Sequence, residues 1–267
     1  MRVLTAGRVD SPRVDAELLA AHVLGVGRTR LALVEAFTPA QLAAYDDLVA
    51  RRAARVPLQH LTGSAPFREL DLAVGPGVFI PRPETELLVD WALRVAPAGG
   101  LVVDLCAGSG AIALSVAAEA REVTVYAVEQ APSALAWLRR NAAGSSVRVV
   151  AGSVLDPTVL STVDGQVDVV LCNPPYVPAG TPVPPEVAEH DPAEAVFAGP
   201  DGLAVIRPVI ARAAGLLRPG GWFGVEHDDS HGAVVPELLR ADGRYAEIED
   251  HVDLAGCPRF ATARRIG

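Results

Sequence analysis

The stretch Asp104-Leu105-Cys106-Ala107-Gly108-Ser109-Gly110-Ala111 decides the fold of this 267-residue chain. It follows the apolar run Leu101–Leu105 and leads into the alanine-rich segment Ala111–Ala120, so it predicts a strand, a glycine-rich turn and a helix. Glycine lets the backbone at 108 and 110 approach a ligand closely and adopt positive φ. The helix that follows offers free N–H groups in its first turn. Such a turn is typical of the ligand-binding edge of an open α/β sheet.

The same alternation of strand and helix continues to the end of the chain. Further strands are predicted at Val123–Val128, Val147–Val150, Val167–Cys172, Trp222–Glu226, Tyr245–Glu249 and Arg259–Ala263. Helices are predicted at Glu84–Val95, Pro132–Asn141, Leu203–Leu217 and Val234–Leu239, the third closed by Arg218-Pro219-Gly220-Gly221. Continuous apolar strands that alternate with helices predict a mostly parallel sheet covered on both faces.

The pattern divides the chain into three parts. Residues 1–55 predict a small helical domain, with Thr38-Pro39 opening one of its helices. It carries no catalytic constellation, so its expected role is to contact a macromolecular partner. Residues 56–83 are rich in proline and glycine and partly alternate from Phe67 to Val74, which predicts a linker with a β-hairpin. Residues 84–267 then form the main domain.

Composition narrows the class of protein. Half of the residues are hydrophobic, the net charge is −9, and all 23 basic residues are arginine. This acidic balance gives no general attraction to phosphate backbones, so nucleic acid is the weaker partner hypothesis. The cluster of Arg51, Arg52 and Arg55 is interpreted as a solvated helix face. No signal peptide and no long apolar span are recognised, so we expect a soluble cytoplasmic protein without a membrane partner.

The three cysteines do not predict a metal site. Cys106, Cys172 and Cys257 lie far apart, and the chain has no CxxC or Cys/His ligand spacing. Reduced thiols are therefore favoured over disulfides or zinc.

An acidic residue, Glu129, stands at the end of the second predicted strand, where a carboxylate accepts hydrogen bonds from both hydroxyls of a ribose. The turn at 104–111 departs from the G-x-G-x-x-G pattern of NAD-binding folds, and the chain has no P-loop lysine. Asp104, at the start of the turn, suits a cationic amino group better than a pyrophosphate. S-adenosylmethionine carries an ammonium group, a ribose and an adenine, so it is the predicted cofactor. The alternative for Glu129 is a solvated strand end.

The run Asn173-Pro174-Pro175-Tyr176 directly follows the predicted strand Val167–Cys172. Two consecutive prolines fix φ and pre-set the loop. The Asn173 side-chain carbonyl and the Pro174 main-chain carbonyl can accept the two N–H bonds of a planar NH2 group, and Tyr176 can stack on it. This arrangement suits methylation of an amide or aromatic amine, because positioning supplies much of the barrier reduction. The alternative is a proline-stiffened turn.

Three further regions make the chain similar to a known family. The first two are the runs Phe79-Ile80-Pro81-Arg82-Pro83-Glu84-Thr85-Glu86 and Pro57-Leu58-Gln59-His60-Leu61-Thr62-Gly63. The third comprises Asp191-Pro192-Ala193, Gly202-Leu203 and Glu226-His227. With Asn173–Tyr176, these runs resemble the protein-(glutamine-N5) methyltransferases that modify bacterial peptide-chain release factors. The resemblance covers nearly the whole chain, whereas the Asn-Pro-Pro-Tyr motif alone is shared with adenine-N6 methyltransferases.

The resemblance implies a class I, Rossmann-like methyltransferase domain. Its sheet would have seven strands with the last one antiparallel, and a small helical domain before it would contact the release factor. The implied reaction transfers a methyl group from S-adenosylmethionine to the side-chain nitrogen of the glutamine in a Gly-Gly-Gln tripeptide, leaving S-adenosylhomocysteine. Asn173, Pro174, Pro175 and Tyr176 would bind the glutamine, and all but Pro175 would be catalytic.

The implied cofactor site departs from the family pattern at two places. Cys106 stands where relatives often have glycine, and Ser153 and Val154 stand where many relatives have an aspartate and an aromatic residue beside the adenine. The implied cofactor-binding residues are Asp104, Cys106, Ala107, Gly108, Ser109, Gly110, Glu129, Ser153, Val154 and Asn173.

Three alternatives stay open at this point: methylation of a ribosomal-protein glutamine, adenine-N6 methylation of nucleic acid, and a non-catalytic adaptor that kept the fold. The negative net charge makes nucleic acid the less favoured substrate. The segment 177–200 is expected to form the mouth of the site, with the charges of Glu189, His190 and Asp191 solvated. Arg82 is expected either to anchor the linker or to form a structural salt bridge. Glu226-His227, at a strand end, is a candidate to support the site.

Overall fold

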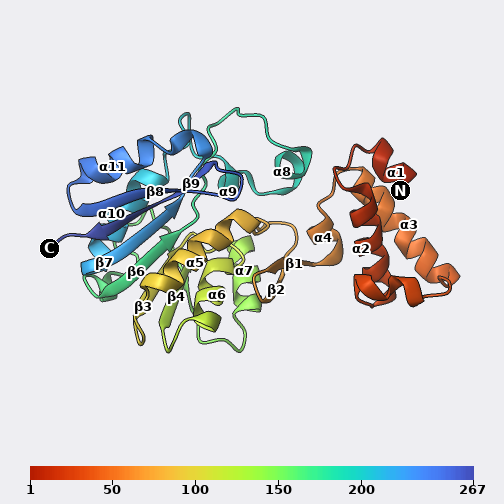
Figure 1. Ribbon diagram of the computed structural model, residues 1–267, viewed down its shortest axis with the longest axis horizontal. Coiled ribbons are helices and arrows are strands. Elements are labelled where there is room, and N and C mark those ends of the chain that lie inside the picture. The colour runs from red at the N-terminus through yellow and green to blue at the C-terminus, as the bar shows by residue number, and fades with distance from the viewer.

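The computed structural model describes residues 1–267 and places them in a helical N-terminal part and a larger α/β part (Figure 1). The helical part comprises α1 (Arg2–Ala6), α2 (Pro12–Leu24), the 3-10 helix η1 (Arg28–Leu33), α3 (Pro39–Ala53) and α4 (Leu58–Thr62). Helix α3 begins as predicted at Thr38, whose hydroxyl accepts the Gln41 N–H in a capping box. A small core that includes Leu4, Leu19 and Leu61 holds the helices together. None of the helices combines the length and the hydrophobicity that a membrane span requires.

Residues 56–83, predicted to be a linker with a β-hairpin, begin with α4, which packs with the helical part. Helix α4 precedes the strands β1 (Ser64–Phe67) and β2 (Leu70–Ala73), which pair antiparallel. Because α4 is a single turn ended by Gly63 in the left-handed conformation, its apolar pattern is too short to predict a helix. Val78 and Ile80 then pack against Ala134, so the linker lies over the main domain before the 3-10 helix η2 (Pro83–Thr85) and α5 (Glu86–Val95) begin.

The main domain is built on a seven-stranded sheet of order β5-β4-β3-β6-β7-β9-β8. Its strands are β3 (Leu101–Leu105), β4 (Thr124–Glu129), β5 (Arg148–Ala151), β6 (Val167–Cys172), β7 (Leu217–Glu226), β8 (Tyr245–Val252) and β9 (Pro258–Arg265). The last strand, β9, runs antiparallel to both of its neighbours, and the pairs from β5 to β7 are parallel. The predicted class, a helical part followed by this sheet, is confirmed.

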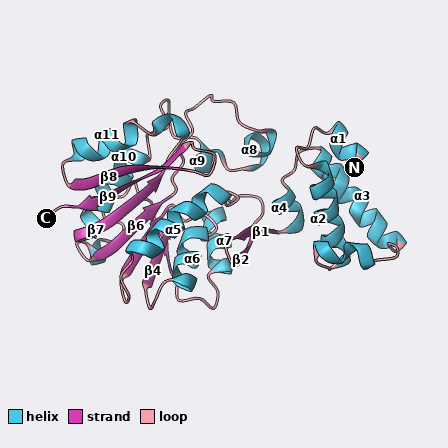
Figure 2. Cartoon of the chain, viewed as in Figure 1, coloured by secondary structure: helices cyan, strands magenta, loops and turns pink.

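Helices cover both faces of the sheet (Figures 1 and 2). Alternate residues of one strand serve the two faces, since Val102 packs with α5, α6 (Ala111–Glu119) and α7 (Pro132–Asn141). Val103, its neighbour, packs with α10 (Ile206–Leu216) and α11 (Val234–Asp242). The two cores fix the sheet between them, so the strand ends at its carboxyl edge are held rigidly.

Strand β7 begins earlier than the sequence predicts. Leu217 already pairs with Val167, and the next pair is Trp222 with Val169. The Arg218-Pro219-Gly220-Gly221 run, expected to be a turn closing a helix, is therefore a bulge inside the strand, with Gly220 at φ 79°.

The helical part also contacts the segment 177–200, which contains α8 (Pro185–His190) and α9 (Ala193–Val196). Arg52 is buried, donates to Asp15 across 2.7 Å and pairs with Glu186 of α8 across 2.8 Å. Arg55 pairs with the other Glu186 oxygen at 2.6 Å. The interpretation of a solvated arginine face is thus wrong for Arg52, because its partners come from parts of the chain that sequence spacing does not connect.

Candidate functional site

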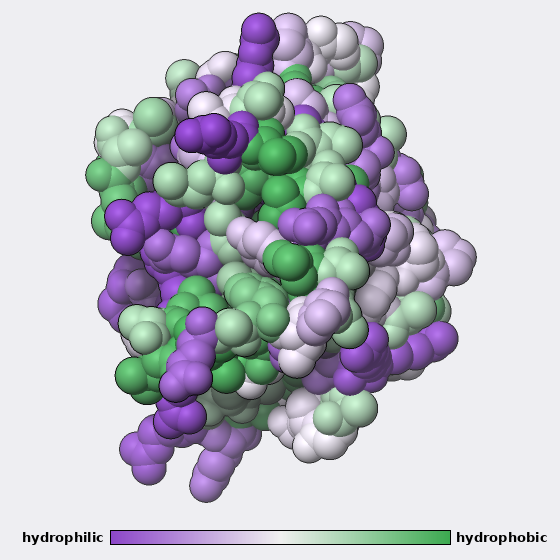
Figure 3. Space-filling model, turned by 90° about the vertical axis from the view of Figure 1, so that its right-hand side faces the viewer, coloured by the Kyte–Doolittle hydropathy of each residue, from purple (hydrophilic) through white to green (hydrophobic).

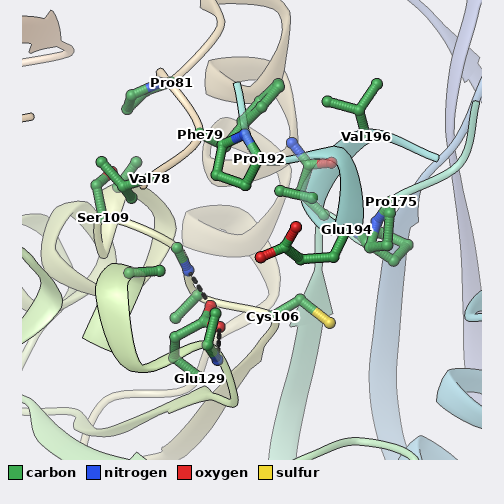
Figure 4. Close-up of a pocket in the computed structure, with 18 of the residues that line it drawn as sticks. Val78, Phe79, Pro81, Cys106, Ser109, Glu129, Pro175, Pro192, Glu194 and Val196 are labelled. Atoms are coloured by element: carbon green, nitrogen blue, oxygen red, sulfur yellow. Dashed lines mark hydrogen bonds between the residues drawn. The ribbon is translucent and has the colours of Figure 1, made fainter. Parts of the chain in front are cut away.

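A cavity of about 260 Å³ opens at the carboxyl ends of β3, β4 and β6, under the linker and the segment 177–200 (Figure 4). Leu105 pairs with Cys172 in the parallel register, so the glycine-rich turn and Asn173 leave the sheet at the same level. The structure brings most of the predicted site residues together. Those that line the cavity are Cys106, Ala107, Gly108, Ser109, Glu129, Val154, Asn173, Pro174, Pro175 and Tyr176.

The turn after β3 winds through positive φ at Cys106 (62°), Gly108 (58°) and Gly110 (91°). Cys106 therefore holds a left-handed conformation that a residue with a side chain rarely adopts. A Cβ on Gly110 would lie 2.7 Å from the Leu138 side chain, and Gly110 does not line the cavity. Gly110 thus allows α7 to pack against the turn, whereas Gly108 borders the open space.

Glu129 ties the turn to the end of β4. One carboxylate oxygen accepts the Gly108 N–H at 2.8 Å, and the other accepts the Ala131 N–H at 2.7 Å. The residue is buried, with 7% of its surface exposed, yet it lines the cavity. Since each carboxylate oxygen can accept a second hydrogen bond, Glu129 can hold ligand hydroxyls while it fixes the turn.

Besides Gly110, two predicted cofactor residues do not line the cavity, Asp104 and Ser153. Asp104 is 1% exposed and sits beneath the turn, where Oδ2 accepts the Ala113 N–H at 3.1 Å and Oδ1 has no partner. Burial raises the pKa of the Asp104 carboxyl well above its usual range. Ser153 donates to Gln130 Oε1 at 2.6 Å, and it is Gln130 that lines the cavity. In this structure Asp104 thus contacts the start of α6, and Ser153 contacts Gln130.

Asn173 belongs to a hydrogen-bond chain that the sequence did not predict. Its Nδ2 donates to Thr85 Oγ1 at 3.0 Å, and Thr85 Oγ1 donates to Glu226 Oε2 at 2.7 Å. Tyr176 donates its hydroxyl to the other Glu226 oxygen at 2.9 Å. Burial raises the pKa of Glu226 to about 7 and raises that of Tyr176. Asn173 Oδ1 accepts no hydrogen bond from the protein, so it is free to meet a ligand in the cavity.

The segment 177–200, which was expected to form the mouth of the site, contributes one wall of the cavity. Asp191 is 8% exposed and pairs with Arg82 at 2.7 Å, and burial raises its pKa to about 6. The expectation of a solvated Asp191 is therefore wrong, and Arg82 forms the salt bridge that was one of its two expected roles. Arg82 also lies over the Phe79 ring, while Glu194 extends its carboxylate between Pro192 and Cys106 (Figure 4).

Gly202 is expected to be intolerant of substitution because it lies against the backbone of the site. It has φ 72°, and an added Cβ would lie 2.2 Å from the Tyr176 carbonyl oxygen. Changing Gly202 to alanine should lower the free energy of unfolding by about 3 kcal/mol, the sum of overpacking and left-handed strain. Urea denaturation of the wild type and the variant measures this.

Gly180 provides the matched control for that experiment. Its φ is 86°, but an added Cβ would meet nothing within 4 Å. Gly180→Ala should therefore cost only about 1 kcal/mol, from strain alone. Equal destabilisation by the two substitutions would show that the contact with Tyr176 does not matter.

The comparisons with known proteins agree with this geometry. A family model described as "PrmC N-terminal domain" matches residues 2–63, and one described as "Methyltransferase small domain" matches residues 69–190. The release factor glutamine methyltransferase of Mycolicibacterium smegmatis is 54% identical over 98% of this chain and 94% of its own. Those of Streptomyces coelicolor and Mycobacterium tuberculosis are 50% and 46% identical over 99% of this chain, covering 94% and 89% of theirs.

Solved structures share the fold at lower identity. A methyltransferase from Pyrococcus furiosus has a TM-score of 0.54 and 19% identity, covering 75% of this chain and 90% of its own. The Thermus thermophilus 16S rRNA N2 G1207 methyltransferase, solved with AdoMet and guanosine, has a TM-score of 0.53 and 20% identity, covering 76% and 49%. These likenesses show the fold of the α/β part.

Proposed function

The chain belongs to the release factor glutamine methyltransferases, and we propose that it transfers the methyl group of S-adenosylmethionine to N5 of the glutamine in the Gly-Gly-Gln tripeptide of peptide-chain release factors. One observation carries the proposal within this chain. Glu129, suited to a ribose, and Asn173, suited to a planar amide, line the same cavity. Donor and acceptor sites in one cavity are what a direct transfer between two bound molecules requires.

The residues present fit S-adenosylmethionine. The Glu129 carboxylate has lone pairs left for ribose hydroxyls, and a Cβ on Gly108 would meet only open space, which leaves the turn accessible to a ligand. Val154, after β5, offers an apolar surface, and Gln130, after β4, offers an amide; both are suited to a purine. When bound, the cofactor would supply a methyl group on a positively charged sulfur, and S-adenosylhomocysteine would remain.

Asn173, Pro174 and Tyr176 are the residues we assign to the acceptor. The Asn173 NH2 group is occupied by Thr85, so Oδ1 is the atom that accepts one N–H of the substrate amide. The Pro174 carbonyl would accept the other N–H, and the two bonds would hold the nitrogen lone pair in one direction. They also stabilise positive charge as it develops on that nitrogen. Tyr176, held through its hydroxyl by Glu226, and Pro175 would pack on the amide plane.

We assign the helical residues 1–55 to recognition of the release factor. This end of the molecule shows hydrophobic side chains among charged ones (Figure 3). Leu33 is 80% exposed and Leu42 is 49% exposed, and a hollow in this part of the molecule is lined in part by Phe37 and Tyr45. Exposed apolar side chains beside a hollow are suited to a contact with a protein partner. The salt bridges from Arg52 and Arg55 to Glu186 would connect that contact to the mouth of the cavity.

Methyl transfer from labelled S-adenosylmethionine tests the proposal directly. We expect the protein to label a release factor and to lose that label when the tripeptide glutamine is changed to alanine. Label that persists on the alanine variant, or that appears only on a ribosomal protein, DNA or RNA supplied in parallel, would contradict the substrate assignment. If calorimetry detects no binding of S-adenosylmethionine, the proposal that the protein is an S-adenosylmethionine-dependent enzyme is wrong.

A further inference from the structure

We infer that Thr85 and Glu226 are positioning residues that orient the Asn173 amide, so that its carbonyl oxygen and not its NH2 group faces the substrate glutamine. The inference rests on the proposed function and extends it to residues beyond the Asn173–Tyr176 loop. It starts from the geometry at the sheet edge. Cys172 pairs with Val225, so Asn173, just after β6, lies level with Glu226, the last residue of β7, and Thr85 of η2 hydrogen-bonds to both side chains.

The direction of each hydrogen bond between Asn173, Thr85 and Glu226 follows from which groups can donate and which can accept. An ionised carboxylate can only accept, so Thr85, with its single hydroxyl proton, must donate to Glu226. The Thr85 oxygen then has only lone pairs left and must accept, which requires the Asn173 NH2 group to point at it. Without this partner the two ends of the amide have nearly the same shape and either could face the cavity. The opposite orientation would present N–H donors to the N–H donors of the substrate.

The same carboxylate fixes a second site residue. Tyr176 donates to Oε1 while Thr85 donates to Oε2, so Glu226 sets both the acceptor group and the ring that flank the substrate position. Glu226 is 1% exposed and Thr85 3%, so the hydrogen bond between them is shielded from bulk water. Loss of either bond would leave a buried polar group unsatisfied, so the chain is rigid.

The direction of the hydrogen bonds from Asn173 through Thr85 depends on the charge of Glu226. The charged and titratable groups that face it are Glu84 from η2, Cys172 from β6, Tyr176 and Arg259. Burial raises its pKa, and Glu84 adds to this, whereas the hydrogen bonds from Thr85 and Tyr176 and the Arg259 cation lower it, leaving it at about 7. As the pH falls through this value the carboxyl gains a proton and becomes a donor, so Thr85 is released from its fixed direction.

Turnover should therefore fall as the pH is lowered through about 7. Glu226→Gln removes the titrating group, so the turnover of this variant should be slower at every pH and lack the inflection near pH 7.

Thr85→Val removes the hydroxyl at nearly constant shape and should lower kcat about 10-fold, with KM for the release factor changed less. Thr85→Ser keeps the hydroxyl and should recover most of the activity. Thr262→Val, at another buried threonine, is the control for a general loss of stability.

A second readout does not need methyl transfer. In protein labelled with 15N in its asparagine side chains, the Asn173 NH2 resonance should shift with a midpoint near pH 7, and the shift should vanish in Glu226→Gln and Thr85→Val. Wild-type kcat in Thr85→Val, or an Asn173 resonance indifferent to Glu226, would overturn the inference. Failure of the wild type to methylate release factors at any pH while the Asn173 resonance still titrates would instead contradict the proposed function.

Discussion

Replacing Asn173 with alanine is expected to lower the turnover number of glutamine methylation by about 10²-fold or more, the scale on which one oriented polar contact to the reacting group is lost. The substitution removes the only side-chain acceptor that the Asn173–Tyr176 loop offers to the substrate amide, and it leaves Thr85 without its donor. Affinity for S-adenosylhomocysteine should change little, because the turn and Glu129 are untouched. Single-turnover kinetics and calorimetry measure the two quantities separately.

Gln130→Ala is the matched control for this experiment. Gln130 is a second amide that lines the cavity, but it lies at the end of β4 and pairs with Ser153. Its loss should weaken cofactor binding while turnover at saturating cofactor stays close to wild type. If Asn173→Ala instead abolishes cofactor affinity and leaves turnover intact, the assignment of Asn173 to the acceptor amide is wrong.

The sequence predicts best what is set by local pattern. The strands Leu101–Leu105 and Val167–Cys172 and the helix Pro132–Asn141 have the predicted bounds, because each is an apolar or amphipathic run closed by a turn-forming or capping residue. The order of these elements with a glycine-rich turn then determines where a cavity forms. That much of the site is a consequence of topology.

Contacts between segments that are far apart in the sequence could not be predicted from local pattern. Thr85 and Glu226 are 141 residues apart, and nothing in either residue's neighbourhood indicates the other. Their types gave a partial signal, since a buried strand end with an acid needs hydrogen-bond donors. The same limit explains why Asp191 was expected in solvent, because its cation, Arg82, is supplied by the linker 109 residues earlier.

Residue roles within a motif were also underdetermined. Asp104 and Gly110 belong to the turn that the sequence identified, yet one lies beneath it and the other allows Leu138 to approach. Some residues of a motif are needed for the packing of the turn, so a residue that belongs to the motif does not necessarily contact a ligand.

Glu129 should be the residue on which cofactor affinity depends most. Its carboxylate accepts the Gly108 and Ala131 N–H groups and has lone pairs left for ribose hydroxyls. We expect Glu129→Gln to weaken binding of S-adenosylhomocysteine about 10- to 100-fold, because hydrogen bonds to a charged acceptor contribute about 1.5–3 kcal/mol. An amide can accept at only one end, so one of the two main-chain N–H groups would also lose its partner. Isothermal calorimetry gives the dissociation constants.

Ligands that differ only in the ribose separate these two effects of Glu129. Wild-type protein should bind adenosine more tightly than 2′,3′-dideoxyadenosine, and Glu129→Gln should lose most of that preference. Damage to the turn alone would weaken both ligands equally and preserve the preference. Glu194→Gln removes a charge from another carboxyl that lines the cavity, so it controls for the general electrostatic field. If Glu194→Gln erases the ribose preference as fully as Glu129→Gln does, the hydroxyls are not bound by Glu129, and its role is confined to holding the Gly108 turn.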